Sequence, residues 1–212
     1  MKEVMNRIKE LKVVPVVKVD SVDEARALSS ALLEGGLPVA EITLRTSAGI
    51  PAIKAISDEL PEMLVGAGTV LNLRQAVDAV KAGARFIVSP GLSVDVAEYC
   101  EENNILYLPG CVTPTEIMTA LSLGITTVKF FPASVYGGLK AIKALAAPFN
   151  EVTFMPTGGV NEENLSEFLS FKKIIACGGS WMVDGKLIKE GRFDEIASLA
   201  KKAREIAAKT EN

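Results

Sequence analysis

Short apolar segments alternate with longer amphipathic segments along the whole chain. The apolar segments are four to six residues long and read as almost continuous hydrophobic runs, without the polar alternation of half-exposed strands. Parallel strands covered on both faces have this pattern. The sequence predicts eight such strands, at residues 13–18, 39–44, 64–68, 86–89, 105–108, 127–131, 152–155 and 174–177.

Each predicted strand is followed by a segment with helical periodicity, and one more amphipathic helix precedes the first strand at residues 1–11. Ser21 and Glu24 have the spacing of a capping box, which predicts the start of a helix that runs to about Gly35. Glycines 35–36, 83 and 124 follow helical segments at comparable points and predict helix ends. The other helices are expected at residues 48–60, 73–82, 94–103, 115–123, 138–146, 163–171 and 194–209.

About eight strand–helix units fill the chain without a linker or a second domain. Eight parallel units can close into a barrel, and closure removes both edges of the sheet. The competing architecture is a doubly wound open sheet, but no G-x-G-x-x-G follows the first strand. The sequence therefore predicts an α/β protein: a single (β/α)8 TIM barrel domain over residues 1–212, with a short N-terminal helix.

Composition narrows the function further. The 212 residues include 23 basic and 26 acidic side chains, so the net charge is −3, and no nucleic acid or membrane partner is expected. The first residues lack the apolar run of a signal peptide, and we expect a cytoplasmic protein. Cys100, Cys111 and Cys177 lack metal-ligand spacing and read as reduced, packed thiols. The chain contains no histidine, which excludes histidine-based triads.

Lys129 is the least expected residue in this pattern, because it lies inside the apolar run 127–133 (TVKFFPA). A buried ammonium loses hydration, so it pairs with an anion, reaches water or gives up its proton. A neutral amine can attack a ketone. Lys18, which also ends an apolar strand, is the rival, but an exposed pair with Asp20 would satisfy it.

Other polar residues gather at the predicted carboxyl ends of the strands, where barrel enzymes carry their chemistry. Glu41 can point into the barrel and exchange protons with an amine, or it can form a structural ion pair with Arg45 or Lys18. Arg45 suits bidentate capture of a carboxylate, unless it is an exposed loop residue. Thr69 can donate to a substrate oxygen, or can cap the helix that starts near Asn72. Pro90 is an additional candidate at the end of the fourth strand.

The last two strand ends predict a phosphate site. Thr157, Gly158 and Gly159 follow the seventh strand, while Gly178, Gly179 and Ser180 follow the eighth. Glycines allow backbone N–H groups to approach an anion, and a short helix starting near Gly179 would add its positive end. The alternative is that the paired glycines only make tight turns.

Seven segments carry a family resemblance. They are residues 13–17 (VVPVV), 40–45 (AEITLR), 65–70 (VGAGTV), 86–91 (FIVSPG), 128–133 (VKFFPA), 155–160 (MPTGGV) and 178–181 (GGSW). In this order and spacing the chain resembles the 2-keto-3-deoxy-6-phosphogluconate aldolases, a family that includes 4-hydroxy-2-oxoglutarate aldolase.

The resemblance implies a class I (Schiff-base) aldolase on a (β/α)8 barrel, assembled as a homotrimer. Lys129 matches the Schiff-base lysine and Glu41 the general acid/base. Arg45 and Thr69 match residues that hold pyruvate, and Phe131 matches an aromatic beside the lysine. Thr157, Gly158, Gly159 and Ser180 match the phosphate site. The implied mechanism needs no metal and no cofactor, because the iminium is the electron sink.

Two positions depart from the commonest family pattern: Ser134 stands where a glutamate is usual, and Lys18 where many relatives carry arginine. The sequence leaves the stereochemistry at substrate carbon 4 open, so a galactonate-derived 6-phosphate is an alternative substrate. Two other classes of protein would also use such glycine loops to bind phosphate. One is a barrel isomerase or synthase acting on another phosphate, and the other is a non-catalytic sugar-phosphate-binding barrel.

Overall fold

The computed structural model describes residues 1–210, which form parallel strands joined by helices in an α/β fold. The strands are β1 (Val13–Val17), β2 (Val39–Thr43), β3 (Leu64–Gly68), β4 (Phe86–Val88), β5 (Leu106–Leu108), β6 (Thr127–Phe130), β7 (Thr153–Pro156) and β8 (Cys177–Gly179). Six of them pair in the order β5-β4-β3-β2-β1-β8, and β6 pairs with β7. Single bridges join Gly110 to Lys129, Phe154 to Ile174 and Thr157 to Gly178.

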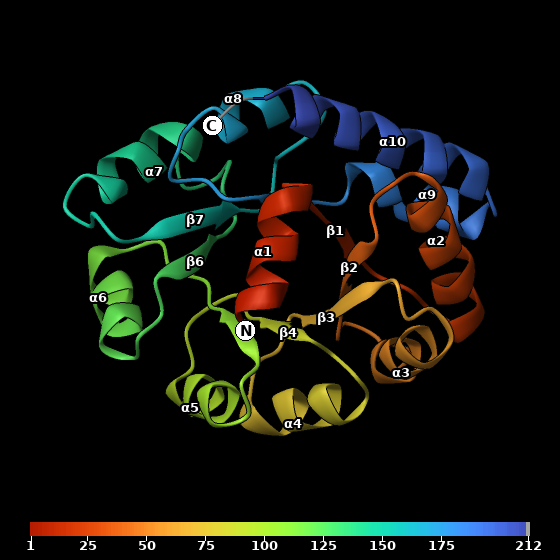
Figure 1. Cartoon of the computed structure of the whole chain (residues 1–212), viewed down its shortest axis with the longest axis horizontal. Coiled ribbons are helices and arrows are strands. Elements are labelled where there is room, and N and C mark those ends of the chain that lie inside the picture. Colours follow the sequence, from red (N-terminus) through yellow and green to blue (C-terminus); the bar gives the residue numbers. More distant parts are fainter. Residues whose placement is uncertain (211–212) are drawn as a thin grey trace.

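The helices surround these curled strands (Figure 1). They are α1 (Lys2–Leu11), α2 (Val22–Glu34), α3 (Gly49–Glu59), α4 (Leu73–Lys81), α5 (Val94–Glu102), α6 (Pro114–Ser122), α7 (Gly138–Ala146), α8 (Leu165–Leu169), the 3-10 turn η1 (Trp181–Val183), α9 (Gly185–Lys189) and α10 (Phe193–Lys209). None of the helices within residues 1–210 is long and apolar enough to cross a membrane.

Two apolar clusters explain why the strands read as continuous hydrophobic runs. In β1, Val13 and Val17 pack in the larger cluster under the surrounding helices, whereas Val14 packs in the smaller, inner cluster. In β4 the same alternation sends Ile87 outward and Phe86 inward. Both faces of each strand are therefore buried, as the pattern predicted.

Helix α1 covers the amino ends of the strands. Its Val4, Ile8 and Leu11 are buried in the inner cluster together with Val14 and Val39, which lie at strand starts. Figure 1 shows α1 lying across the strands near the centre of the molecule. Burying each of these side chains contributes about 1.5–3 kcal/mol before the entropic cost of ordering the chain. The apolar face of α1 thus fills one end of the strand layer and leaves the carboxyl ends of the strands for the site.

Most predicted elements agree with the structure within one to three residues, and the differences are local. Gly36, Gly83 and Gly124 have φ angles of 74°, 106° and 74°, as expected for residues that end helices. Ser21 caps α2 by accepting from the Glu24 N–H, but the Glu24 carboxylate accepts from Asp20 rather than from Ser21. A reciprocal capping box starts α6 instead.

The prediction for the last strand was wrong. It was expected at residues 174–177, but β8 spans Cys177–Gly179, so Gly178 and Gly179 are strand residues rather than loop residues. The register with β1 pairs Val13 with Cys177, and this contact decides where the strand begins. After β8, the 3-10 turn η1 lies close to the place where the sequence predicts a short helix, near Gly179, whereas α9 is not predicted.

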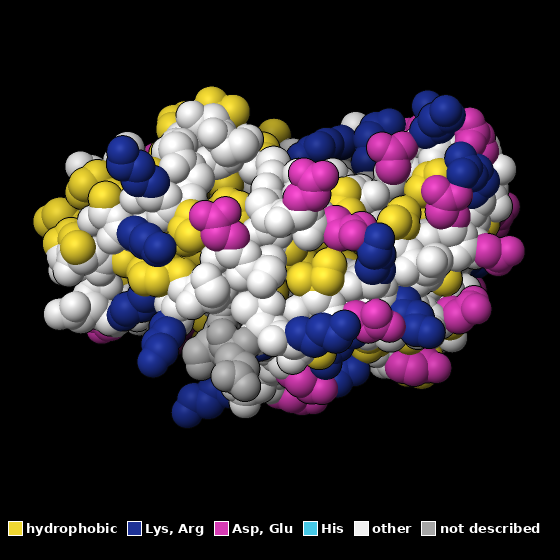
Figure 2. Space-filling view, turned by 90° about the horizontal axis from the view of Figure 1, so that it is seen from above, with side chains coloured by type: hydrophobic (Ala, Val, Ile, Leu, Met, Phe, Trp, Pro, Cys, Tyr) yellow, Lys and Arg dark blue, Asp and Glu magenta, His cyan; other side chains and the backbone are white. Residues whose placement is uncertain are grey.

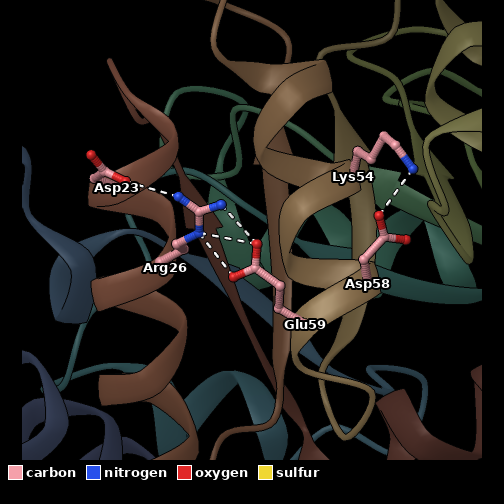
Figure 3. Close-up of polar contacts among 5 residues, drawn as sticks. All are labelled: Asp23, Arg26, Lys54, Asp58 and Glu59. Atoms are coloured by element: carbon pink, nitrogen blue, oxygen red, sulfur yellow. Dashed lines mark hydrogen bonds and ion pairs between the residues drawn. The ribbon is translucent and has the colours of Figure 1, made fainter.

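Charged side chains of both signs lie on the outside of the molecule. Figure 2 views the face formed by α7, α8 and α10, where basic and acidic groups are interspersed with apolar ones. Figure 3 shows Arg26 of α2 bound to Asp23 on its own helix and, through two nitrogens, to Glu59 of α3. The hydrogen bond from Arg26 lowers the pKa of the Glu59 carboxyl. All three cysteines are buried and free of disulfides, as predicted.

Candidate active site

The alternation of side chains along β2 and β6 turns Glu41 and Lys129 to the same interior. Ala40 and Ile42 flank Glu41 and pack in the larger cluster, under the surrounding helices. Val128 and Phe130, on either side of Lys129, pack in the same cluster. Because successive strand residues face opposite sides, the two ionisable groups must face inward. The hydrophobic neighbours thereby place two charges where apolar residues are usual.

Lys129 and Glu41 form a buried ion pair. The distance from Lys129 Nζ to Glu41 Oε1 is 3.2 Å, and the side chains are 5% and 1% exposed. The second carboxylate oxygen, Oε2, has no hydrogen-bond partner within the described residues. Breaking a buried pair by removing one partner costs about 3–5 kcal/mol, so neither residue is a neutral choice for the fold.

Both backbone hydrogen-bonding groups of Lys129 bond to the segment that follows β5, which fixes the root of its side chain. Its N–H donates to Pro109 O at 2.8 Å, and its carbonyl accepts from the Cys111 N–H at 2.9 Å. Lys129 Nζ also lies 5.1 Å from the centre of the Phe131 ring. The amine therefore lies between a carboxylate and an aromatic face.

Arg45 and Thr69 contact each other. Arg45 Nε donates to Thr69 Oγ1 at 3.0 Å, and Thr69 has a φ of 56°, which β-branched residues rarely adopt. The alternative that Thr69 caps the next helix is wrong, because Asn72 caps α4 by accepting from the Gln75 N–H. The hydroxyl of Thr69 instead orients the guanidinium of Arg45.

A cavity of about 710 Å³ opens at the carboxyl ends of the strands. Eight of the predicted site residues line it: Lys18, Arg45, Lys129, Phe131, Thr157, Gly158, Gly159 and Ser180. The other three, Glu41, Thr69 and Pro90, are not lining residues. Glu41 lies behind Lys129 and contacts its Nζ. Thr69 is linked to the cavity through Arg45, and Pro90 lies on the surface.

Residues 157–159 form a turn with an unusual backbone. Gly158 and Gly159 have φ angles of 90° and 82°, and the Ser134 side chain occupies the place where a Cβ of Gly159 would lie. The turn is held by hydrogen bonds from the Ala133 and Ser134 N–H groups to the carbonyls of Thr157 and Gly158. This fixed turn lines the cavity, as does Ser180.

The helix expected near Gly179 begins at Trp181 and is only the 3-10 turn η1. A single turn has little dipole to offer an anion, so the backbone amides and hydroxyls are the relevant donors. Thr157 Oγ1 is buried and has no partner within residues 1–210. It packs against Gly178, at the place that a Cβ on that glycine would occupy.

Lys18 is satisfied by an exposed pair, as one of the alternatives anticipated. Its Nζ donates to Asp20 at 2.9 Å, and its side chain is 51% exposed.

Two further lysines of the cavity, Lys186 and Lys189 of α9, were not singled out from the sequence. The residue that could have indicated α9 in the sequence is Asp184, a typical N-cap residue. Its side chain accepts from the Lys186 N–H at the start of α9.

A buried lysine–carboxylate pair at the carboxyl ends of parallel strands defines an α/β enzyme site that works through a lysine amine. The comparisons with known proteins agree. The family model described as KDPG and KHG aldolase matches residues 4–199. KDPG stands for 2-keto-3-deoxy-6-phosphogluconate, and KHG is 4-hydroxy-2-oxoglutarate. This chain therefore belongs to the KDPG and KHG aldolase family.

Individual relatives cover nearly the whole chain. The 2-dehydro-3-deoxy-phosphogluconate aldolase of Haemophilus influenzae is 42% identical over 204 residues, which are 96% of each protein. The KDPG aldolase of Legionella pneumophila, solved with pyruvate as a covalent carbinolamine intermediate, is 36% identical with a TM-score of 0.91, over 94% of this chain and 97% of that one. The Zymomonas mobilis enzyme, solved with 3-phosphoglycerate, is 38% identical with a TM-score of 0.90, over 97% of each chain.

Proposed function

We propose that this protein is a class I aldolase that cleaves 2-keto-3-deoxy-6-phosphogluconate to pyruvate and glyceraldehyde 3-phosphate. The observation that carries the proposal is the buried contact of 3.2 Å between Lys129 Nζ and Glu41 Oε1 at the wall of the cavity. An imine-forming lysine needs a neighbour that accepts and returns protons at each step. The Legionella relative, captured with a covalent carbinolamine, supports the same chemistry here.

Lys129 starts the reaction by passing a proton to Glu41, and its neutral amine attacks carbon 2 of the ketone. Glu41 returns the proton to the carbinolamine hydroxyl, which leaves as water and forms the iminium. The Glu41 carboxylate then takes the proton of the carbon-4 hydroxyl while the bond between carbons 3 and 4 breaks. The electrons of that bond move into the iminium, giving an enamine and glyceraldehyde 3-phosphate.

Glu41 completes the cycle by giving its proton to carbon 3 of the enamine, and hydrolysis of the resulting imine frees pyruvate. The iminium is the electron sink, so the sequence of steps needs neither a metal nor a cofactor. Arg45, oriented by Thr69, would hold the pyruvate carboxylate at the mouth of the site. Phe131 would pack beside the imine.

The phosphate of the substrate would lie at the turn of Gly158 and Gly159, with Thr157 and Ser180 as further donors. These residues line the same cavity as Lys129, so one substrate molecule can reach both ends. The Zymomonas relative, solved with 3-phosphoglycerate, supports a phosphate-binding role. The family description also names KHG aldolase, so we propose 4-hydroxy-2-oxoglutarate as a second, phosphate-free substrate. The alternative substrate is the galactonate-derived 6-phosphate, which differs in its stereochemistry at carbon 4.

We further propose a closed (β/α)8 barrel that forms a single domain and assembles as a cytoplasmic homotrimer. Closure is supported by the bridges from Gly110 to Lys129 and from Thr157 to Gly178, which link the six-stranded and two-stranded sheets on both sides. Assembly is supported by large apolar side chains that are exposed in the single chain: Leu71, Leu73, Val94, Met118, Val135 and Tyr136. Sedimentation analysis would distinguish a trimer from a monomer.

The decisive experiment is borohydride reduction in the presence of pyruvate, followed by peptide mass spectrometry. The proposal expects a stable adduct on Lys129, and none on Lys18 despite its position at the cavity. Reduction that leaves Lys129 unmodified, or that labels only Lys18, would sink the assignment. A sugar-phosphate-binding barrel without catalysis would bind phosphate ligands but give no adduct at all.

A further inference from the structure

Two glycines of β3 face the interior of the strand layer, and a side chain would fit at neither. A Cβ on Gly66 would run into the Phe86 ring, which comes from the neighbouring strand β4. A Cβ on Gly68 would run into the Glu41 side chain, 2.6 Å from Cγ and 2.8 Å from Cδ, and closer still to Oε1. Real Cβ atoms do not approach other heavy atoms so closely, so the carboxylate occupies the space that Gly68 leaves.

The register of the strands explains why Glu41 must use this space. Glu41 pairs with Gly66, and the place beside Gly66 is already filled by Phe86, whose ring is fully buried. The side chain of Glu41 therefore extends along the strand to the level of Gly68, which pairs with Thr43. The oxygen nearest to Gly68, Oε1, is the one that contacts Lys129 Nζ.

The backbone of Gly68 cannot retreat without loss of strand pairing. Its carbonyl accepts from the Leu44 N–H at 2.8 Å, and its strand pairs with β2 over its full length. Glu41 has no solvent to move into, because it is fully buried. A methyl group at position 68 must therefore be accommodated by displacement of the carboxylate.

We propose that Gly68 is a positioning residue for catalysis, which sets the approach of the Glu41 carboxylate to Lys129 by having no side chain. This proposal rests on the proposed aldolase function and deepens it, because it assigns the geometry of the Glu41–Lys129 pair to a residue that does not line the cavity. Gly68 acts through Glu41 alone.

The test compares Gly68→Ala with two matched glycine variants. Gly66→Ala introduces the same methyl group on the same strand but meets Phe86, and Gly91→Ala meets nothing within 4 Å. The measurements are the thermal midpoint, kcat and KM for cleavage, and the rate of hydrogen–deuterium exchange at the pyruvate methyl group. The proposal expects Gly68→Ala to lose about 10²-fold or more in kcat and in exchange, with a small change in KM, because proton transfer by a misplaced base fails. Gly66→Ala should lose thermal stability with a much smaller loss of kcat, and Gly91→Ala should match the wild type.

A double-mutant cycle tests whether Gly68 acts through Glu41. Glu41→Ala removes Cγ, Cδ and both carboxylate oxygens, and with them the atoms that a Cβ at position 68 would meet. The losses should therefore not add: the double variant should have the thermal midpoint and the residual kcat of Glu41→Ala alone, and this non-additivity is the signature of direct coupling. If Gly68→Ala does not fold, the double variant decides, since it should fold as well as Glu41→Ala. Additive losses, a double variant less stable than Glu41→Ala, or a Gly68→Ala enzyme with wild-type kcat would overturn the proposal.

Failure of the proposed function would look different. In that case the wild type itself would give no adduct with pyruvate and no exchange. An active wild type whose Glu41→Gln variant is inactive, combined with an undisturbed Gly68→Ala variant, would leave the aldolase function standing and remove only the role of Gly68.

Discussion

Glu41 and Lys129 are 88 residues apart in the chain, yet their side chains meet at 3.2 Å in an interior from which water is almost excluded. The low exposure strengthens the interaction and makes each group the other's main polar partner. In the proposed reaction, this contact carries the first proton transfer, from the amine to the carboxylate, and Glu41 then exchanges protons directly with the substrate.

The first prediction concerns the carboxylate. Glu41→Gln keeps the shape of the side chain but removes its ability to accept a proton, so kcat should fall by about 10²–10⁴-fold. Steady-state cleavage assays measure this fall, and circular dichroism checks that the fold persists. Glu34→Gln, which changes an exposed carboxylate at the end of α2, is the matched control and should keep wild-type turnover. Wild-type turnover in Glu41→Gln would remove Glu41 from the mechanism.

The second prediction concerns the contact between Thr69 and Arg45. Thr69→Val keeps the size and β-branching at a φ of 56°, but removes the hydroxyl that accepts from Arg45 Nε. Loss of a hydrogen bond to a charged group is worth about 1.5–3 kcal/mol, so KM should rise by roughly 10- to 100-fold, with a smaller change in kcat. Thr69→Ser retains the oxygen and should keep a KM near that of the wild type. Equal KM values for the two variants would show that the hydroxyl does not orient Arg45.

How far the sequence predicts this site depends on the residue. The apolar neighbours of Lys129 and Glu41 determine that both face inward, because strand periodicity is a local property. The distance between them is not local, since it depends on the register of β2, β3 and β6 and on the absence of a side chain at Gly68. Local patterns therefore indicate which residues face the site and leave their contacts to the tertiary structure.

The errors in the fold have the same origin. Residues 174–177 are apolar and predict a strand, whereas glycine is depleted in strands, so the sequence places Gly178 and Gly179 in a loop. In the structure these glycines pair with β1, and a Cβ on Gly178 would run into Thr157 Oγ1. Close packing at the site overrides the local preference. Helix α9 is only five residues long, too short for its periodicity to be recognised.

The third prediction separates the phosphate turn from the imine site. Gly159→Ala places a methyl group against Ser134 at a φ of 82°, where alanine is strained, so the turn should open. KM for the phosphorylated substrate should rise by about 10-fold or more, while KM for 4-hydroxy-2-oxoglutarate, which has no phosphate, should stay nearly constant.

Ser180→Ala is the milder companion of this variant, because it removes one donor and leaves the turn intact. It should raise KM for the phosphorylated substrate alone, by a factor of about 3–10, as expected for one hydrogen bond. Parallel kinetics with both substrates give the comparison. Equal increases for the two substrates would mean that residues 157–159 shape the whole cavity and do not recognise phosphate.

The fourth prediction concerns alkaline pH and the buried thiols. Burial raises the pKa of the Cys100 thiol to about 12 and that of Cys111 to about 12, from an ordinary value of 9.0. Burial also raises the pKa of Cys177. A raised pKa means that the folded state keeps a proton that the unfolded state loses, so the stabilisation is complete below pH 9 and declines between pH 9 and 12. Between pH 8 and pH 10, each thiol should lower the free energy of unfolding by about 1.4 kcal/mol.

Cys100→Ala tests this prediction, because its cavity costs the same at both pH values and cancels in the difference. The free energy of unfolding, measured in denaturant at pH 8 and pH 10, should decline by about 1.4 kcal/mol less in this variant than in the wild type. Titration of tyrosines and lysines is common to both proteins and cancels as well. Identical declines would mean that the thiolate of Cys100 forms as readily in the folded protein as in the unfolded chain, which its burial opposes.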